Sequence, residues 1–90
     1  MPHVIIKHFE TTLTPAQKER IATTITEVLT DIFGCLPPAV SIALQPVTPS
    51  NWMETVFVPD IQQGTAEIIQ MPNYAALANA PQNNEDSPHV

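Results

Sequence analysis

Proline stands at position 2 of the chain, directly after Met1. Removal of Met1 would leave Pro2 as a secondary amine on a fixed ring, and the neutral amine is a base. An ordinary α-amino group has a pKa of about 7.7–8.0, and desolvation lowers such a pKa because it disfavours the charged form. A base poised near neutral pH suits proton abstraction beside a carbonyl group. The simpler interpretation is that Pro2 only provides a readily processed N-terminus.

Three further residues have both a functional and an ordinary structural interpretation. Lys7 could attract a carboxylate or be a solvated strand lysine, and Trp52 could line a pocket or belong to the core. Ser41 offers one hydroxyl on an alternating strand, without the context of a nucleophile elbow. Together with Pro2, these residues are the candidate substrate-binding and catalytic groups.

The histidines and the single cysteine do not form a metal-binding pattern. His3 and His8 are five positions apart, so on one straight strand they face opposite sides. Cys35 has no Cys or His neighbour at zinc spacing and no evident base partner. We therefore predict no metal and no cofactor, and we interpret His3 as a bystander beside Pro2.

The elements that must position these residues form a strand, a helix and a second strand. Residues 4–9 are β-branched and aromatic, which predicts a strand that begins just after Pro2. Residues 39–45 alternate between apolar and polar or small side chains, which predicts the second strand. The intervening stretch has one apolar face, formed by Ile21, Ile25, Val28 and Ile32.

The helix between the strands is predicted over 15–33. Thr14 and Gln17 have the spacing of a capping box, and Pro15 suits the first helical position. Gly34 is predicted to cap the C-terminus of this helix. Strand, helix and strand make a parallel βαβ unit, whose two strands and one helix cannot cover both faces of the sheet. A second copy of the chain is the obvious partner.

The rest of the chain has weaker signals. We predict a loop at 46–51, a short helix or turn at 52–58, a helix from Pro59 through Ile69 that Pro72 ends, and a disordered tail at 77–90. The domain itself is predicted to occupy residues 1–76.

Composition limits the partners and the compartment. The chain has 90 residues and a net charge of −6, and its permanently basic side chains are Lys7, Lys18 and Arg20. This charge disfavours nucleic acid and acidic membrane surfaces. One cysteine allows no internal disulfide, and there is no signal-peptide pattern or apolar membrane span. We expect a cytoplasmic protein.

Several motifs resemble the tautomerase superfamily when taken in order. The opening strand at 2–9, the helix entry at 13–18 and the second strand at 40–45 are similar to those of 4-oxalocrotonate tautomerase-like proteins. The segments at 49–52 and 71–74 look closer still to the small bacterial PptA branch. Each motif is weak alone, but their order and spacing over roughly residues 2–75 are specific.

The resemblance implies a function that the periodicity alone does not. Family members use the N-terminal proline to move a proton between carbon and oxygen in keto–enol isomerisation of 2-oxo acids. Two βαβ subunits pair into a four-stranded sheet, as a homodimer in the PptA branch and as a hexamer in the 4-oxalocrotonate enzymes. An aromatic residue of the family near the active site matches Trp52.

Two arginines that bind the substrate in the best-known members are absent. Thr12 and Ser41 occupy the corresponding positions. Their absence favours a monocarboxylate with an apolar or aromatic body, such as the phenylpyruvate enol, over a dicarboxylate. Two alternatives remain open. One is a catalytically silent dimeric βαβ module, and the other is a hydratase or decarboxylase that uses the same proline as a cation.

Overall fold

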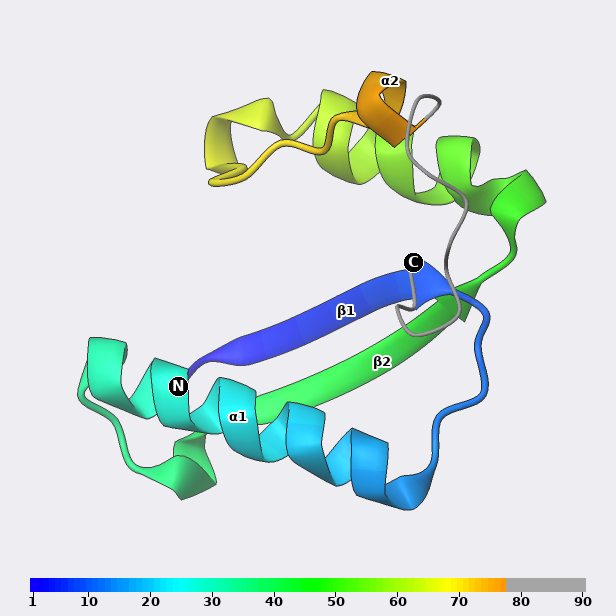
Figure 1. The fold of residues 1–90 in the computed structure, drawn as a ribbon. Coiled ribbons are helices and arrows are strands. Elements are labelled where there is room, and N and C mark those ends of the chain that lie inside the picture. The colour runs from blue at the N-terminus through cyan, green and yellow to red at the C-terminus, as the bar shows by residue number, and fades with distance from the viewer. Residues whose placement is uncertain (78–90) are drawn as a thin grey trace. The chain divides into compact units, whose positions relative to one another are not determined.

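The structure is a computed structural model that describes residues 1–77. Apart from Leu77, the tail predicted over 77–90 lies outside the described residues. The chain forms two compact units, Met1–Thr48 and Pro49–Val90. The first contains β1 (His3–Phe9), α1 (Pro15–Phe33), η1 (Pro37–Ala39) and β2 (Ser41–Val47). Figure 1 shows α1 lying alongside the paired strands, and the chain order β1, α1, β2 confirms the predicted βαβ unit.

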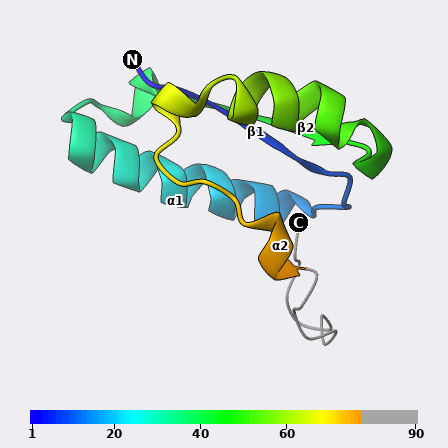
Figure 2. The same cartoon turned by 90° about the horizontal axis from the view of Figure 1, so that it is seen from above.

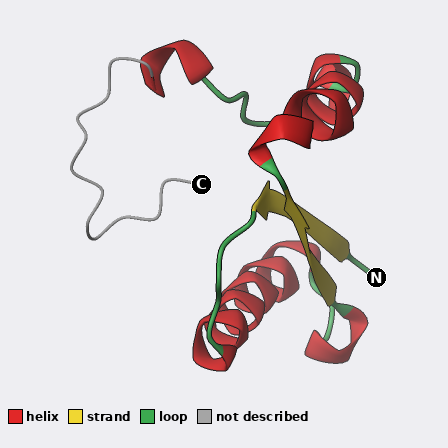
Figure 3. Cartoon of the chain, turned by 90° about the vertical axis from the view of Figure 1, so that its right-hand side faces the viewer, coloured by secondary structure: helices red, strands yellow, loops and turns green. Residues whose placement is uncertain are grey.

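The two strands of the first unit are parallel and paired along their whole length. The register runs from His3 opposite Ser41 to Phe9 opposite Val47. Because side chains alternate between the faces of a sheet, paired residues share one face. Figure 3 shows the twisted pair of strands with α1 on one side of it. The face opposite α1 carries His3, Ile5 and Ser41, and Ile5 is 48% exposed. This arrangement confirms the fold class that the strand–helix–strand order predicts, α/β (α+β) built on a single βαβ subunit with short C-terminal helices.

Helix α1 has the predicted bounds because local signals define both of its ends. The backbone N–H of Gln17 donates to Thr14 Oγ1 at 3.1 Å, and the N–H of Thr14 donates to Gln17 Oε1 at 2.9 Å. This reciprocal capping box satisfies two N–H groups that the helix start would otherwise leave free. At the other end, Gly34 has φ of 68°, a left-handed conformation that glycine adopts without strain.

The apolar face of α1 is only partly covered in the subunit. Figure 2 shows α1 lying lengthwise beside the strands. Ile21 and Ile25 are half-buried, but Val28 is 56% exposed and Ile32 is 70% exposed. The periodicity therefore predicted an apolar stripe correctly, but the second half of the stripe is exposed to solvent in a single chain. A small subunit of this kind gains core by association.

Strand β2 starts and ends two residues later than predicted over 39–45. Pro37 and Pro38 belong to the 3₁₀ turn η1, closed by the N–H of Ala39 donating to Leu36 O at 2.9 Å, so the strand begins only at Ser41. It then continues through Pro46 to Val47, which corrects the first two residues of the loop predicted over 46–51. A proline is tolerated there because β2 is an edge strand of a two-stranded sheet.

The second unit consists of short helical elements. They are η2 (Pro49–Asn51), η3 (Met53–Gln62), η4 (Thr65–Glu67) and α2 (Tyr74–Leu77). Among residues 1–77, Val56 in η3 is the only buried hydrophobic side chain, with 4% exposure. No helix within the described range is both long and apolar enough to span a membrane.

The helix predicted from Pro59 through Ile69 is wrong in both bounds. Pro59 lies inside η3, a helix of π type whose hydrogen bonds span five residues, as in Gln63 N–H to Val58 O at 3.0 Å. A wider turn gives the proline ring more room beside the preceding carbonyls than an α-helix does. Helix η3 ends at Gln62, and a Cβ on Gly64 would lie 2.6 Å from the carbonyl oxygen of Asp60. Only glycine fits this close approach.

Candidate active site

Pro2 is held at the head of β1 by the neighbouring strand. The backbone N–H of Ser41 donates to the carbonyl oxygen of Pro2 at 3.1 Å, and Pro2 itself is half-buried. Met1 is fully exposed, so nothing in the described chain covers the bond whose cleavage would free the nitrogen. While Met1 is attached, the Pro2 nitrogen is a tertiary amide and cannot act as a base.

His3 and Ser41 meet directly beside Pro2. They are register partners, and His3 Nδ1 lies 2.6 Å from Ser41 Oγ, within hydrogen-bonding distance. Ser41 was a candidate from the sequence, whereas His3 was interpreted as a bystander. The sequence did not reveal this pair, because the strand starts predicted at residues 4 and 39 would not have placed His3 opposite Ser41. The parallel register, in which His3 and Ser41 both open their strands, appears only in the structure.

Lys7 shares the face of His3 but lies far along the strand. It pairs with Gln45, four residues after the pairing of His3 with Ser41. At roughly 3.3 Å per residue, Lys7 is about 13 Å from His3 along β1. Within one subunit Pro2 and Lys7 are therefore too far apart for both residues to contact one small carboxylate. A role for Lys7 stays a prediction.

Trp52 belongs to an aromatic cluster within the second unit. Its indole N–H donates to the phenolic oxygen of Tyr74 at 2.9 Å. The rings of Phe57 and Tyr74 are 5.4 Å apart between centroids and inclined at 48°, a tilted geometry that aromatic pairs favour. The cluster orders a half-exposed indole, but its contribution to a substrate pocket stays a prediction.

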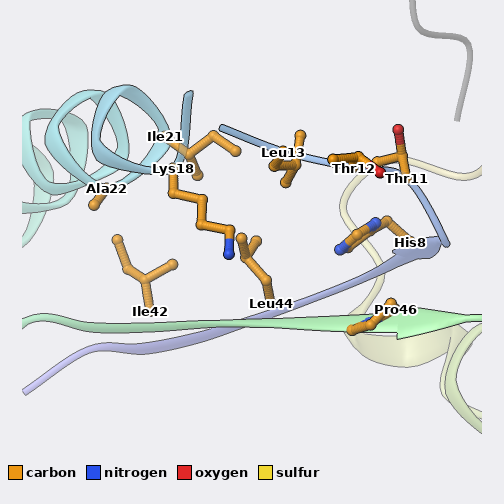
Figure 4. Close-up of a pocket in the computed structure, with 10 residues that line it drawn as sticks. All are labelled: His8, Thr11, Thr12, Leu13, Lys18, Ile21, Ala22, Ile42, Leu44 and Pro46. Atoms are coloured by element: carbon orange, nitrogen blue, oxygen red, sulfur yellow. The ribbon is translucent and has the colours of Figure 1, made fainter. Parts of the chain in front are cut away.

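A pocket of about 670 Å³ lies between α1 and the sheet (Figure 4). It is lined by His8, Thr11, Thr12, Leu13, Lys18, Ile21, Ala22, Ile42, Leu44 and Pro46. The pocket extends from His8 and Pro46 to Ile42, which pairs with Val4, two residues after Pro2. Pro2 itself is not among the lining residues. Thr12 follows the end of β1 and Ser41 opens β2, so these two residues lie at opposite ends of the strands.

His8 donates a hydrogen bond through Nδ1 beside this pocket. Its Nδ1 lies 2.7 Å from the carbonyl oxygen of Phe9, and a carbonyl only accepts, so Nδ1 carries the donated hydrogen. The Nε2 atom is buried without a hydrogen-bond partner and faces the pocket into which Lys18 also extends. In residues 1–77, no three His, Cys, Asp or Glu side chains gather in a way that could hold a metal ion.

A parallel βαβ unit with a proline directly before its first strand defines a class of small α/β subunits. Comparison with known proteins identifies the member of that class. The model of the family described as tautomerase enzyme matches residues 2–56. The chain therefore belongs to the tautomerase family, as the order of motifs predicted. Family membership supports an isomerase of the tautomerase type.

Individual relatives match this chain over nearly their whole length. A tautomerase PptA of Klebsiella pneumoniae subsp. pneumoniae is 41% identical over 75 residues, which is 83% of this chain and 99% of the relative. A probable tautomerase of Xylella fastidiosa is 33% identical over 82 residues, covering 91% of this chain and 99% of the relative. A tautomerase PptA of Escherichia coli is 32% identical over 78 residues, covering 87% of this chain and 100% of the relative. These relatives support the predicted PptA branch.

Proposed function

We propose that the chain catalyses keto–enol tautomerisation of a 2-oxo acid, with the processed Pro2 as general acid and base. The observation that carries the proposal is the position of Pro2. Its carbonyl is hydrogen-bonded to the Ser41 N–H, so the ring and its nitrogen are held at the start of a rigid strand. A fixed base can be oriented toward a bound substrate, which is a large part of general-base catalysis.

The proposed reaction moves one proton in two steps. The neutral Pro2 amine accepts the hydroxyl proton of the enol as the C2–O bond becomes a carbonyl, and the electron pair shifts to C3. The resulting Pro2 ammonium then gives a proton to C3, which regenerates the neutral amine and yields the keto acid. No electrons leave the substrate, so the reaction needs no redox cofactor.

The proposed substrate is a monocarboxylate with an aromatic or apolar body, such as the phenylpyruvate enol. Thr12 and Ser41 stand where the resemblance places arginines, so the site lacks the two guanidinium groups that a dicarboxylate would use. A developing enolate needs hydrogen-bond donors. Ser41 and backbone amides are the candidates within one subunit, and Lys7 is a candidate from a second copy of the chain. Trp52 is the candidate for the apolar wall.

We propose that the active protein is a homodimer in which two βαβ units form one four-stranded sheet. Ile5 on the sheet and Val28 and Ile32 on α1 are large apolar side chains left exposed in one chain. A second copy of the chain would cover this apolar surface and remove it from water, which is favourable for a small subunit. A hexamer is the alternative assembly.

We propose that the protein is located in the cytoplasm, where a single free cysteine stays reduced.

The silent-module alternative is favoured by one observation, the absence of both family arginines. The hydratase or decarboxylase alternative requires a cationic Pro2 and predicts turnover of unsaturated acids instead of enols. Both alternatives predict that the intact protein does not convert an enol to the keto acid, whereas the proposal predicts that it does.

The test compares ketonisation of enolised phenylpyruvate by the processed protein and by Pro2→Ala, after mass spectrometry has confirmed loss of Met1. We expect Pro2→Ala to lose at least about a hundredfold in kcat/KM, the usual contribution of a positioned general base. Pro15→Ala is the matched control, because Pro15 occupies the first helical position of α1, where alanine is tolerated. Equal rates for wild type and Pro2→Ala would contradict the proposal, and no turnover in any variant would favour the silent module.

A further inference from the structure

We propose that His3 and Ser41 act as one unit that binds the carboxylate of the substrate beside Pro2, with His3 as the positioning residue and Ser41 as the binding group. This inference rests on the proposed Pro2 reaction and adds the carboxylate-binding group that the missing arginines leave open. The carrying observation is the 2.6 Å separation of His3 Nδ1 and Ser41 Oγ.

The pairing of β1 with β2 places His3 and Ser41 next to the proposed base, Pro2. His3 follows Pro2 directly, and Ser41, 38 residues after His3, is its register partner. The Ser41 N–H also donates to the Pro2 carbonyl at 3.1 Å. One side-chain and one backbone hydrogen bond thus join the same three residues. In the single chain both side chains are exposed, on the face of the sheet opposite α1.

The pair offers a donor to an anion in either of its hydrogen-bonded arrangements. If the Ser41 hydroxyl donates to His3 Nδ1, the neutral imidazole carries its hydrogen on Nε2, which can donate to a ligand. If Nδ1–H donates to Ser41 Oγ, the hydroxyl hydrogen is released for a ligand. A carboxylate favours the arrangement in which the donor nearest to it is free. His3 therefore allows Ser41 to turn its only hydrogen toward the substrate.

The chemistry of the pair selects a monocarboxylate. A hydroxyl hydrogen-bonded to an imidazole provides one directed donor to an anion, whereas a guanidinium provides a bidentate, charged fork. A donor of this kind suits one carboxylate on a substrate whose remaining surface is apolar. It also gives a local contact to an anion in a chain whose net charge is −6.

The experiment measures both turnover and binding in five variants: His3→Leu, Ser41→Ala, their double variant, His3→Asn and Ser41→Thr. Turnover uses enolised phenylpyruvate. Binding uses 3-phenylpropanoate, which has the carboxylate but no enol, and 3-phenylpropanamide, which has the same body without the charge. His3→Asn is the conservative variant, because its amide N–H₂ can donate to Ser41 Oγ much as Nδ1–H does. Ser41→Thr keeps the hydroxyl on the strand and checks that the sheet tolerates substitution there.

We expect His3→Leu and Ser41→Ala each to raise KM and the dissociation constant of 3-phenylpropanoate about tenfold, the range of a hydrogen bond to a charged group. kcat changes less, because the proton transfer itself is left to Pro2. The double variant loses no more than either single variant, since both remove the same unit. His3→Asn and Ser41→Thr recover most of the affinity, and binding of the amide is unchanged throughout.

Additive losses, equal loss of acid and amide binding, or unchanged acid binding would overturn the proposal and leave a structural hydrogen bond only. Failure of the Pro2 mechanism has a separate signature. In that case Pro2→Ala keeps its turnover, or no enol is turned over, while the binding measurements with 3-phenylpropanoate still decide the role of the pair.

Discussion

The indole N–H of Trp52 donates to the phenolic oxygen of Tyr74, which lies 22 residues further along the chain, at 2.9 Å. Tyr74 in turn contacts the ring of Phe57 at a centroid separation of 5.4 Å. The three aromatic side chains therefore order one another, and the orientation of the only tryptophan depends on a hydroxyl outside its own helix.

Tyr74→Phe removes the acceptor of the Trp52 N–H and keeps the ring that contacts Phe57. A net hydrogen bond contributes about 0.5–1.5 kcal/mol. If Trp52 forms the apolar wall of the site, KM for the phenylpyruvate enol rises about two- to tenfold, and KM for the enol of a short aliphatic 2-oxo acid changes less. Because Trp52 is the only tryptophan, its fluorescence emission reports the change directly. Altered emission with identical kinetics would exclude Trp52 from the site.

The rate should decrease in acid if Pro2 is the base. Only the neutral amine accepts a proton, so kcat/KM falls about tenfold per pH unit below the pKa of the Pro2 amine in the free enzyme. A pH profile of enol ketonisation measures this pKa. Activity that increases in acid would instead indicate a cationic proline, as the hydratase alternative requires.

Ile32→Glu should weaken the proposed dimer. Ile32 is 70% exposed in the single chain, and burying a new charge in an apolar interface is costly. We expect the dimer dissociation constant to rise at least about tenfold in sedimentation experiments. Thr23→Glu is the control, because residue 23 is exposed and roughly 180° around the helix axis from Ile32. Equal sedimentation of wild type and Ile32→Glu would show that this end of α1 is not in the interface.

Thr14→Ala should destabilise α1. The substitution removes the oxygen that accepts the Gln17 N–H at 3.1 Å, and loss of such a cap costs about 1 kcal/mol. Thr23→Ala is a matched control in the exposed helix interior, where alanine is the better helix former, so it should be neutral or slightly stabilising. Chemical denaturation at one protein concentration measures both. Equal effects of the two substitutions would contradict a specific role for the cap.

The two glycines of the chain should respond to alanine for different reasons. In Gly64→Ala the new Cβ would lie 2.6 Å from the backbone carbonyl of Asp60, and such overpacking costs about 1–3 kcal/mol. In Gly34→Ala there is open space, but φ of +68° is strained by about 1–2 kcal/mol. Thermal unfolding should show both losses. A Gly64→Ala variant as stable as wild type would mean that the turn after η3 relaxes without cost.

Helix α1 and the βαβ order were predictable because their signals are local. Thr14, Gln17 and Gly34 define the helix ends through contacts within a few residues, and the order of motifs identified the family. The start of β2 was predicted two residues early because alternation continues through Ala39 and Val40, whereas the 3₁₀ turn after Pro37 prevents them from joining the strand. The bounds of η3 were missed because a proline inside a helix normally ends it.

The sequence alone therefore determined the elements whose signals lie within one turn or one strand, and it determined the family through the order of those elements. Tertiary structure decided which side chains meet. His3 faces Ser41 across 38 residues only because the parallel register aligns the two strand starts, and the exposure of Val28 and Ile32 follows from the limited area of a two-stranded sheet. Contacts between distant segments depend on how strands pair and on how much surface they cover, and periodicity within one segment contains neither quantity.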